Sequence, residues 1–383
     1  MVLAHFIKKL ERVSMISKTH GIFKTKVAVT LFVASVSVST QVAAATVTEL
    51  NKTKFTFGGY IKAEGIVNKP DTGDRTFESS LRQSRLNFSA DTLIEAHKVK
   101  AFIEIDFWDD LDKGADASYA PRLRHAYLGI DNVTIGQTWS GQFFAAAPMD
   151  VEMLNMFGLG TGTLAGTGAT VRPDLLVHYH RNGLRLTAQD PAWNQASYPD
   201  MVAAYTYRFR GQAVNLAVTG REVNTINDES KFAAAVSLGS KFQLAGTTLA
   251  LSAFTGQGAG VYAGWGYLGA AGADQNTDVN AVTGKLITTT GFSAGITQKF
   301  TPKLRGTVRY GQVTSNHVNV MRAPDDTFEM VNVNLIYTYL PNLDFGIEWR
   351  DQNAQNTSPT TTDSAARPKG QQVELMAMYK FST

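Results

Sequence analysis

The chain has 383 residues, of which 44% are hydrophobic and 18% are charged, so it is too apolar to be a disordered protein. Cysteine is absent, which excludes disulfide bonds, thiolate metal sites and a cysteine nucleophile. The formal charge of +3 resides at the N-terminus: residues 1–45 carry +5, which leaves −2 for the rest, so we expect no nucleic-acid partner.

The N-terminus has the order of basic, apolar and small residues that is typical of a secretory signal peptide. Lys24 and Lys26 precede the apolar run 27–38, and three alanines follow at 43–45. A transmembrane helix needs about 20 apolar residues, which disfavours the alternative of an N-terminal anchor helix. Met15 is a second possible start of translation. The predicted division of the chain is a signal peptide at 1–45, a short lead at 46–54 and, from the strand pattern of the remaining residues, a β-barrel at 55–383.

Apolar residues after the signal peptide recur at every second position, in segments of about ten residues, which is the pattern of transmembrane β-strands. No segment there has 18 consecutive apolar residues, which excludes a helical membrane protein. Inside lipid, every backbone N–H and C=O must be paired within the protein, and besides helices only a closed β-barrel achieves this. We predict an all-β, antiparallel barrel of sixteen strands, at 55–67, 82–91, 98–108, 122–130, 133–139, 174–181, 184–189, 201–209, 212–221, 231–242, 247–255, 289–300, 303–313, 327–340, 343–351 and 371–381.

Short turns and long loops alternate between these strands. Bacterial outer-membrane barrels have the same arrangement, with the short turns on the periplasmic side. The even number of strands then places both termini in the periplasm. The long loops include 257–286 and 352–369. The short turns are Asp131–Asn132, Arg181–Gly183, Arg210–Gly211, Ala245–Gly246, Thr301–Pro302 and Pro341–Asn342.

The third long loop, residues 140–173, is rich in glycine and nearly uncharged. An external loop in contact with water is normally polar, so we expect this one to pack against protein. We predict that it folds into the barrel and narrows the pore. A cap over the outer rim is the alternative.

Charges on the inward phase of the strands are the candidates for a functional site. Guanidinium groups in a narrow aqueous channel raise the local concentration of anions and bind carboxylates through paired N–H donors. Arg85, Arg122 and Arg124 rank first, because they lie on early strands beside the root of the third loop. The candidates for lining the pore and binding anions are Arg85, Arg122, Arg124, Lys100, Arg185, Arg208, Arg305, Arg309, Arg350, Lys62, Glu104 and Asp106.

Each arginine taken alone is also consistent with an ion pair to a carboxylate on a neighbouring strand. Such carboxylates are Glu64, Glu104, Asp106, Glu348 and Glu374. The leading hypothesis is therefore a channel for passive diffusion of small polar solutes that prefers anions. A general or sugar-preferring porin remains open, and so does a structural barrel with a plugged lumen.

We expect no enzyme activity and no cofactor or metal. A barrel hydrolase needs a serine, a histidine and a carboxylate or amide at one rim, and no histidine after the signal peptide lies in a recognisable nucleophile motif. His178 and His180 could share a metal across one strand face, but without a third ligand they are better explained as polar residues of the lumen or a turn.

Five short motifs lie within about residues 57–145. They are Gly59–Ala63 (GYIKA), Arg82–Phe88 (RQSRLNF), Phe102–Phe107 (FIEIDF), Leu123–Tyr127 (LRHAY) and Gly136–Ser140 (GQTWS). Together they resemble the DcaP-like porins, the dicarboxylate porins of Gram-negative bacteria. Each motif is short, but their order and spacing make the set moderately specific.

This resemblance implies a homotrimer in the outer membrane, in contact with lipid and lipopolysaccharide, that passes small anionic solutes. It also implies that Arg85 and Arg124 stand where the family carries pore arginines. Two features depart from the family. The lead at 46–54 is too short for the long heptad helix that many members have before the barrel, and Ser382 and Thr383 follow the aromatic Phe381, where outer-membrane barrels usually end.

Overall fold

The structure is a computed structural model, and it describes residues 48–50, 52–112, 118–142, 152–154, 172–192, 196–225, 229–263, 278–280, 283–316, 327–353 and 369–381. All of these residues belong to one compact unit that spans 43–383. The predicted signal peptide and most of the loop at 140–173 lie outside the described residues. No described helix is long and apolar enough to span a membrane.

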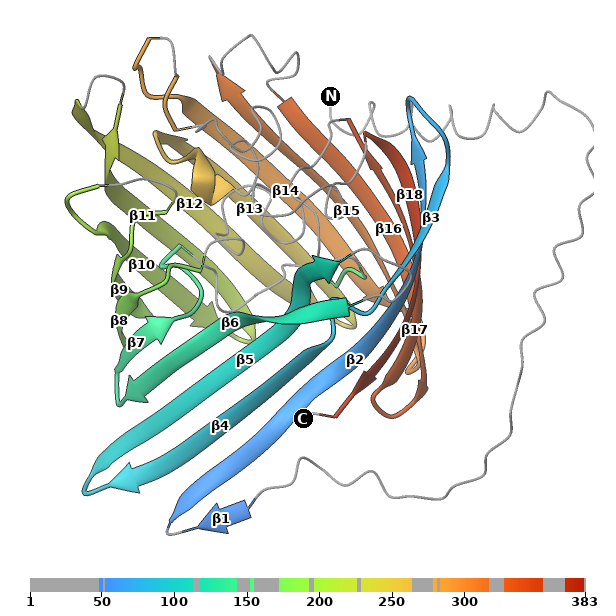
Figure 1. The fold of residues 1–383 in the computed structure, drawn as a ribbon, viewed down its shortest axis with the longest axis horizontal. Coiled ribbons are helices and arrows are strands. Elements are labelled where there is room, and N and C mark those ends of the chain that lie inside the picture. Colours follow the sequence, from blue (N-terminus) through green and yellow to red (C-terminus); the bar gives the residue numbers. More distant parts are fainter. Residues whose placement is uncertain are drawn as a thin grey trace, which may run out of the picture. The chain divides into compact units, whose positions relative to one another are not determined.

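Sixteen antiparallel strands pair edge to edge and close into a barrel, as the alternating pattern predicts (Figure 1). The barrel closes where β18 pairs with β2, in a register that runs from Lys380↔Tyr60 to Gly370↔Pro70. The strands of the barrel are β2 (Thr53–Pro70), β4 (Arg85–Ile94), β5 (His97–Asp112), β6 (Ser118–Ile130), β7 (Val133–Gln137), β8 (Leu176–Arg181), β9 (Leu184–Gln189), β10 (Asp200–Phe209), β11 (Gln212–Asn224), β12 (Ser230–Leu244), β13 (Thr247–Gln257), β14 (Thr288–Lys299), β15 (Leu304–Asn316), β16 (Thr327–Leu340), β17 (Leu343–Gln352) and β18 (Gly370–Lys380).

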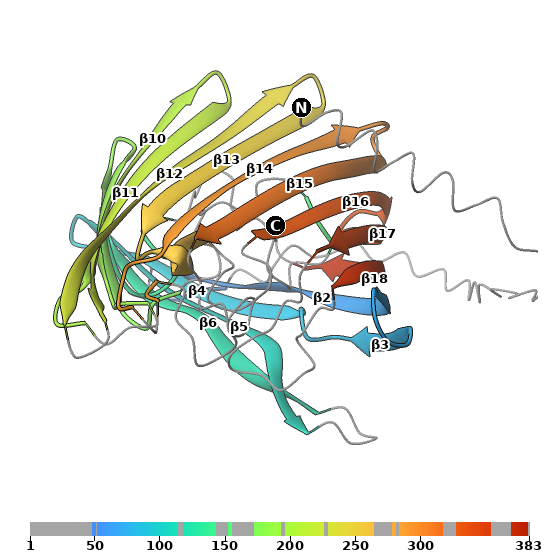
Figure 2. The same cartoon turned by 90° about the horizontal axis from the view of Figure 1, so that it is seen from above.

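The two faces of each strand differ in chemistry. On β17, Asp344, Glu348 and Arg350 are buried, whereas Phe345 and Ile347 between them are 45% and 46% exposed. Because side chains on a strand alternate, this pattern turns the charged residues into the barrel and the apolar residues outward. The outward face is chemically suited to hydrocarbon, and the buried polar side chains lie on the inner face of the strands. Figure 2 shows the strands curving around this interior.

The short connections lie at one end of the barrel, called here the short-turn end. Three of them are two-residue turns in which both residues have positive φ: 51° and 88° at Asn182–Gly183, 47° and 80° at Arg210–Gly211, and 43° and 91° at Ala245–Gly246. This is the turn geometry whose twist matches that of paired antiparallel strands. The last described residue, Phe381, donates its N–H to the carbonyl of Gly59 at 3.0 Å.

The second strand of the barrel is broken, which the sequence did not predict. β3 (Thr76–Ser80) pairs with one part of β2, and β4 pairs with another part. Between them, residues 81–84 leave the ladder and turn polar groups inward: Gln83 Nε2 donates to Glu64 Oε1 at 2.6 Å. The predicted strand at 82–91 therefore begins at Arg85. A further short strand, β1 (Thr48–Leu50), pairs with the beginning of β2, inside the predicted lead.

A β-bulge at Arg124 shifts the alternation of β6. Glu104 pairs with His125, and the next residue of β5, Ile105, pairs with Leu123. Arg124 is therefore an extra residue in β6 that has no pairing partner on β5. Arg124 and His125 are both buried as a result, although neighbours on a regular strand point to opposite faces. The bulge thus adds an imidazole to the inward face beside the guanidinium group.

Candidate functional site

The described part of the third loop contacts the inner wall on β2 and β15 to β17. Glu152 accepts two hydrogen bonds of 2.6 Å from Arg305, through Nε and Nη2. Leu154 donates its N–H to Glu348 at 2.9 Å, and its carbonyl accepts from Lys62 Nζ. Its side chain is buried with Ile336 and Met376. These three residues, Glu152 to Leu154, form the loop anchor, and their position agrees with the predicted inward fold of the loop.

The root of the same loop contacts a different part of the wall. The N–H of Gly141 donates to Gln189 on β9 at 2.7 Å, and Gln142 donates to Thr219 on β11 at 3.0 Å. Arg185 Nη2 donates to the carbonyl of Gly141 at 2.6 Å. Because the root contacts β9 and β11 while the anchor contacts β2 and β15 to β17, the loop connects two separate parts of the inner surface.

Arginines of β4 and β6 gather around two carboxylates of β5. Arg122 holds Asp106 through two hydrogen bonds of 3.0 and 2.7 Å. Arg124 donates to Asp106 at 2.7 Å and to Glu104 at 3.0 Å. Arg85 Nη1 lies 3.7 Å from Glu104 Oε1. The three arginines that the sequence ranked first are therefore brought together, as are Glu104 and Asp106.

A fourth guanidinium group, Arg172, joins them from the end of the third loop. Arg172 lies 5.3 Å from the centre of the Trp139 ring, and Arg124 lies 5.8 Å from the same ring. Burial lowers the pKa of Arg172, and the positive charges of Arg124 and Arg122 lower it further, but a guanidinium group stays protonated at neutral pH. Arg85, Arg122, Arg124 and Arg172 with Glu104 and Asp106 form the arginine cluster. Among the described side chains it has four positive and two negative groups, a formal excess of +2.

Two of the other predicted cations, Lys62 and Arg305, form ion pairs at the loop anchor. Lys62 lies 2.6 Å from Glu64 and 3.4 Å from Glu374. Arg305 contacts Asp344 at 3.0 Å in addition to Glu152. The remaining contacts there are Arg309 Nη1 to Met153 Sδ at 3.5 Å and Arg350 to Gln372. The region around the loop anchor thus carries these four predicted cations and five carboxylates, which nearly balance them in number; the carboxylates are Glu64, Glu152, Asp344, Glu348 and Glu374.

Lys100, Arg185 and Arg208 lie on the inward phase but near the short turns, apart from the arginine cluster. Lys100 Nζ lies 3.4 Å from Asp91 Oδ1. Arg185 is tied to the loop root, as described above. Arg208 is exposed near the end of β10, and it makes no hydrogen bond or ion pair with the described residues. The twelve candidates therefore form three groups rather than one site.

The loop between β13 and β14 adds a buried network that the sequence did not predict. Arg221 donates to Asp278 at 2.7 Å and to Asp200 at 3.2 Å. Tyr262, in the short 3-10 helix η3 (Gly260–Ala263), donates its hydroxyl to Asp200 and accepts from Gln189 at 2.7 Å. Burial raises the pKa of Tyr262 well above its usual value, and the charge of Asp200 raises it further, so the hydroxyl stays a donor.

Sequence reasoning also missed Glu152 and Arg172, because the loop that carries them was read as nearly uncharged. The signal was present: they are two of the three charged residues in the apolar, glycine-rich segment 140–173, where a buried ion needs a partner from elsewhere in the fold.

The histidine pair shows no metal-binding geometry. Both ring nitrogens of His178 have partners, Thr187 Oγ1 at 2.7 Å and the carbonyl of Trp139 at 3.1 Å. Among the described residues, no three histidines, aspartates or glutamates are grouped in a way that could hold a metal ion.

Comparisons with known proteins support the fold. No family model and no curated protein matches the chain. The outer membrane channel DcaP of Acinetobacter baumannii is 19% identical, with a TM-score of 0.68 over 88% of this chain and 100% of that one. OmpF of Salmonella typhi, in complex with daunomycin, is 14% identical, with a TM-score of 0.60 over 86% and 98%. The trimer form of in-vitro folded OmpT of Vibrio cholerae is 13% identical, with a TM-score of 0.54 over 86% and 100%. The chain therefore has a porin-like fold.

Proposed function

We propose that this protein is a channel through which small polar solutes cross the outer membrane by passive diffusion, with a preference for anions. The observation that carries the proposal is the +2 excess of the arginine cluster, on a barrel whose neighbouring wall, around the loop anchor, is nearly balanced in charge. The selectivity of such channels follows from the width of the pore and the sign of its lining.

Dicarboxylates are the solutes that this cluster suits best. Arginine presents several N–H donors in a fixed plane, which matches the two oxygens of a carboxylate. Arg122 and Arg85 each keep part of the side chain exposed, 26% and 16%, so a solute can reach both guanidinium groups. A solute with two carboxylates can therefore contact two guanidinium groups at once, whereas a monocarboxylate contacts them one at a time.

The outer membrane is the location that the outward apolar face and the porin-like fold support. The signal peptide at 1–45 would direct the chain across the inner membrane and then be removed. The barrel would then contact lipid and lipopolysaccharide. Cell fractionation followed by N-terminal sequencing of the mature protein tests this part: a mature chain that begins after residue 45 supports it, and an intact N-terminus in the inner membrane contradicts it.

We further propose that the barrels assemble as a homotrimer. OmpT of Vibrio cholerae, which has the same fold, has been determined in a trimer form. The sequence resemblance to dicarboxylate porins gives the same expectation. The mass of the purified protein in detergent, measured by light scattering with the detergent subtracted, distinguishes a trimer from a monomer.

Ion selectivity of the protein in a planar bilayer tests the main proposal. In a KCl gradient, the reversal potential should have the sign of a channel that prefers chloride over potassium. Succinate should then compete with chloride more strongly than acetate at the same ionic strength. A channel that prefers potassium would overturn the proposal, and equal permeability of both ions would favour the alternative of a general or sugar-preferring porin.

A further inference from the structure

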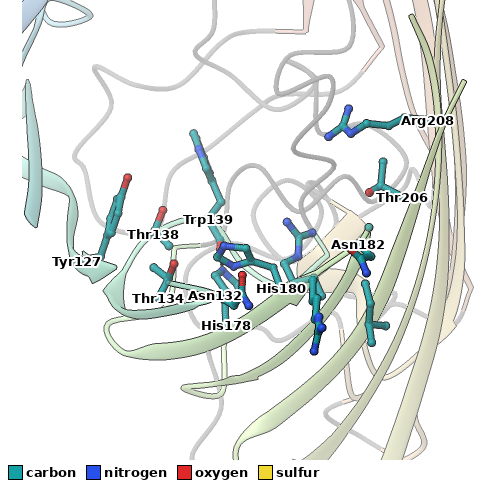
Figure 3. A pocket seen from close by; sticks show the side chains of 14 residues that line it. Tyr127, Asn132, Thr134, Thr138, Trp139, His178, His180, Asn182, Thr206 and Arg208 are labelled. Carbon is teal, nitrogen blue, oxygen red and sulfur yellow. The ribbon is translucent and has the colours of Figure 1, made fainter. Parts of the chain in front are cut away.

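A pocket of about 530 Å³ opens on the inner surface near the short-turn end, next to the arginine cluster (Figure 3). Residues from β6 to β10 line it, together with Asn132, Asn182 and Gly183 from two short turns. Its volume falls within the range that is usual for small-molecule sites.

The lining of this pocket carries positive but no negative side chains. Arg181, Arg185 and Arg208 line it, and none of the described lining residues is a carboxylate. The register places Arg185 opposite Ala204 on β10, and Arg208 lies four residues further along the same face of that strand. Figure 3 shows the Arg208 side chain extending from the wall into the pocket. Because Arg208 has no partner among the described residues, its donors are open to a solute.

Aromatic rings form another part of the lining. Trp139 and Tyr127 both border the pocket. Trp139 also contacts Arg124 and Arg172 of the arginine cluster, at 5.8 and 5.3 Å from its ring centre. The indole thus belongs to both sites, and an anion that leaves the arginine cluster toward the short-turn end can pass directly to the pocket.

We propose that this pocket is a second anion-binding site, which takes a small aromatic carboxylate. The inference rests on the proposed anion channel and adds a place and a solute class to it. The carboxylate contacts Arg208, whose donors are open, and the flat ring lies against Trp139, which borders the same pocket, so charge and aromatic surface are both matched. Two neighbouring sites also suit conduction, because a second bound ion weakens the hold on the first.

Block of the channel by benzoate tests this site. The full-length protein is placed in a planar bilayer in KCl, and benzoate is added to each compartment in turn while the chloride current is recorded. Benzoate should reduce the current in a saturable way, with a dissociation constant at least fivefold lower than that of acetate. Arg208→Gln should weaken the block by benzoate about fivefold or more. Arg210→Gln, which removes the same charge from the adjacent turn but does not line the pocket, should change it less than twofold.

The outcomes separate this inference from the proposed function. If the wild-type protein prefers potassium, both proposals fail. If it prefers chloride but Arg208→Gln leaves the block by benzoate unchanged, the pocket proposal alone fails. Equal block by acetate and benzoate overturns the assignment to aromatic carboxylates. Arg208 is exposed and makes no hydrogen bond or ion pair with the described residues, so its substitution should leave the barrel folded, which heat-modifiable migration on a gel verifies.

Discussion

Arg172 is the guanidinium group best suited to test whether excess positive charge sets the ion preference. It lies outside the strands, so Arg172→Gln removes a charge without changing a strand ladder. Its contact with Trp139 at 5.3 Å places that charge in the arginine cluster, beside Arg124. Arg122 and Arg124 are less suitable, because their loss leaves Asp106 without its ion-pair partners.

The magnitude follows from the charge of the cluster. Arg172→Gln lowers the formal excess among the described side chains from +2 to +1. One unit charge at about 5 Å in water contributes about 0.8 kcal/mol, and screening in about 0.1 M salt reduces this to about 0.5 kcal/mol. The local concentration of anions then falls about twofold and that of cations rises about twofold, so the chloride-to-potassium permeability ratio should fall about fivefold.

Reversal potentials in a KCl gradient measure this ratio directly. Arg210→Gln is the matched control, because it removes the same charge from an exposed turn. Raising the salt concentration should reduce the difference between Arg172→Gln and the wild type, since screening shortens the range of the charge. An unchanged ratio in Arg172→Gln, or an equal fall in Arg210→Gln, would refute the assignment of selectivity to the arginine cluster.

Three further predictions concern the loop, the lipid-facing surface and a turn. Glu152→Gln weakens the bond to Arg305 by about 1 kcal/mol in this partly exposed pair and should increase the noise of the open-channel current in single-channel records. Val218→Lys places a charge on the outward face of β11, so it should lower the free energy of unfolding by about 2 to 4 kcal/mol. Urea titrations in lipid vesicles measure this loss, and the control Arg210→Lys at the turn should lose less. The hydrogen bond from His97 holds the pKa of Asp131 below its usual value. The stability that this carboxylate contributes is therefore complete above about pH 4, the pKa of an unfolded Asp, and is lost as the pH falls through the lower pKa of the folded state. Asp131→Asn should remove this acid sensitivity, measured as the pH dependence of the urea midpoint.

The alternation of side chains along the chain was enough to predict the barrel. A strand that separates lipid from water must place apolar and polar residues on opposite faces. Because this requirement acts within each strand, the order of residues in a segment such as β17 is enough to show it. The short turns are local as well, because their positive φ angles favour a few residue types. The same alternation assigned Arg85, Arg122 and Arg124 to the interior, where the structure places them.

Only the tertiary structure decided which of these charges are balanced. Arg305 and Arg124 look alike in sequence, yet the loop anchor supplies Glu152 to the first while the end of the same loop adds Arg172 beside the second. Those contacts join residues far apart in the chain, and the bulge at Arg124 depends on the pairing of β5 with β6. Electrostatic preference depends on distances between side chains across the lumen, and these distances are fixed by closure of the barrel and the path of the loop rather than by the spacing of residues along a strand.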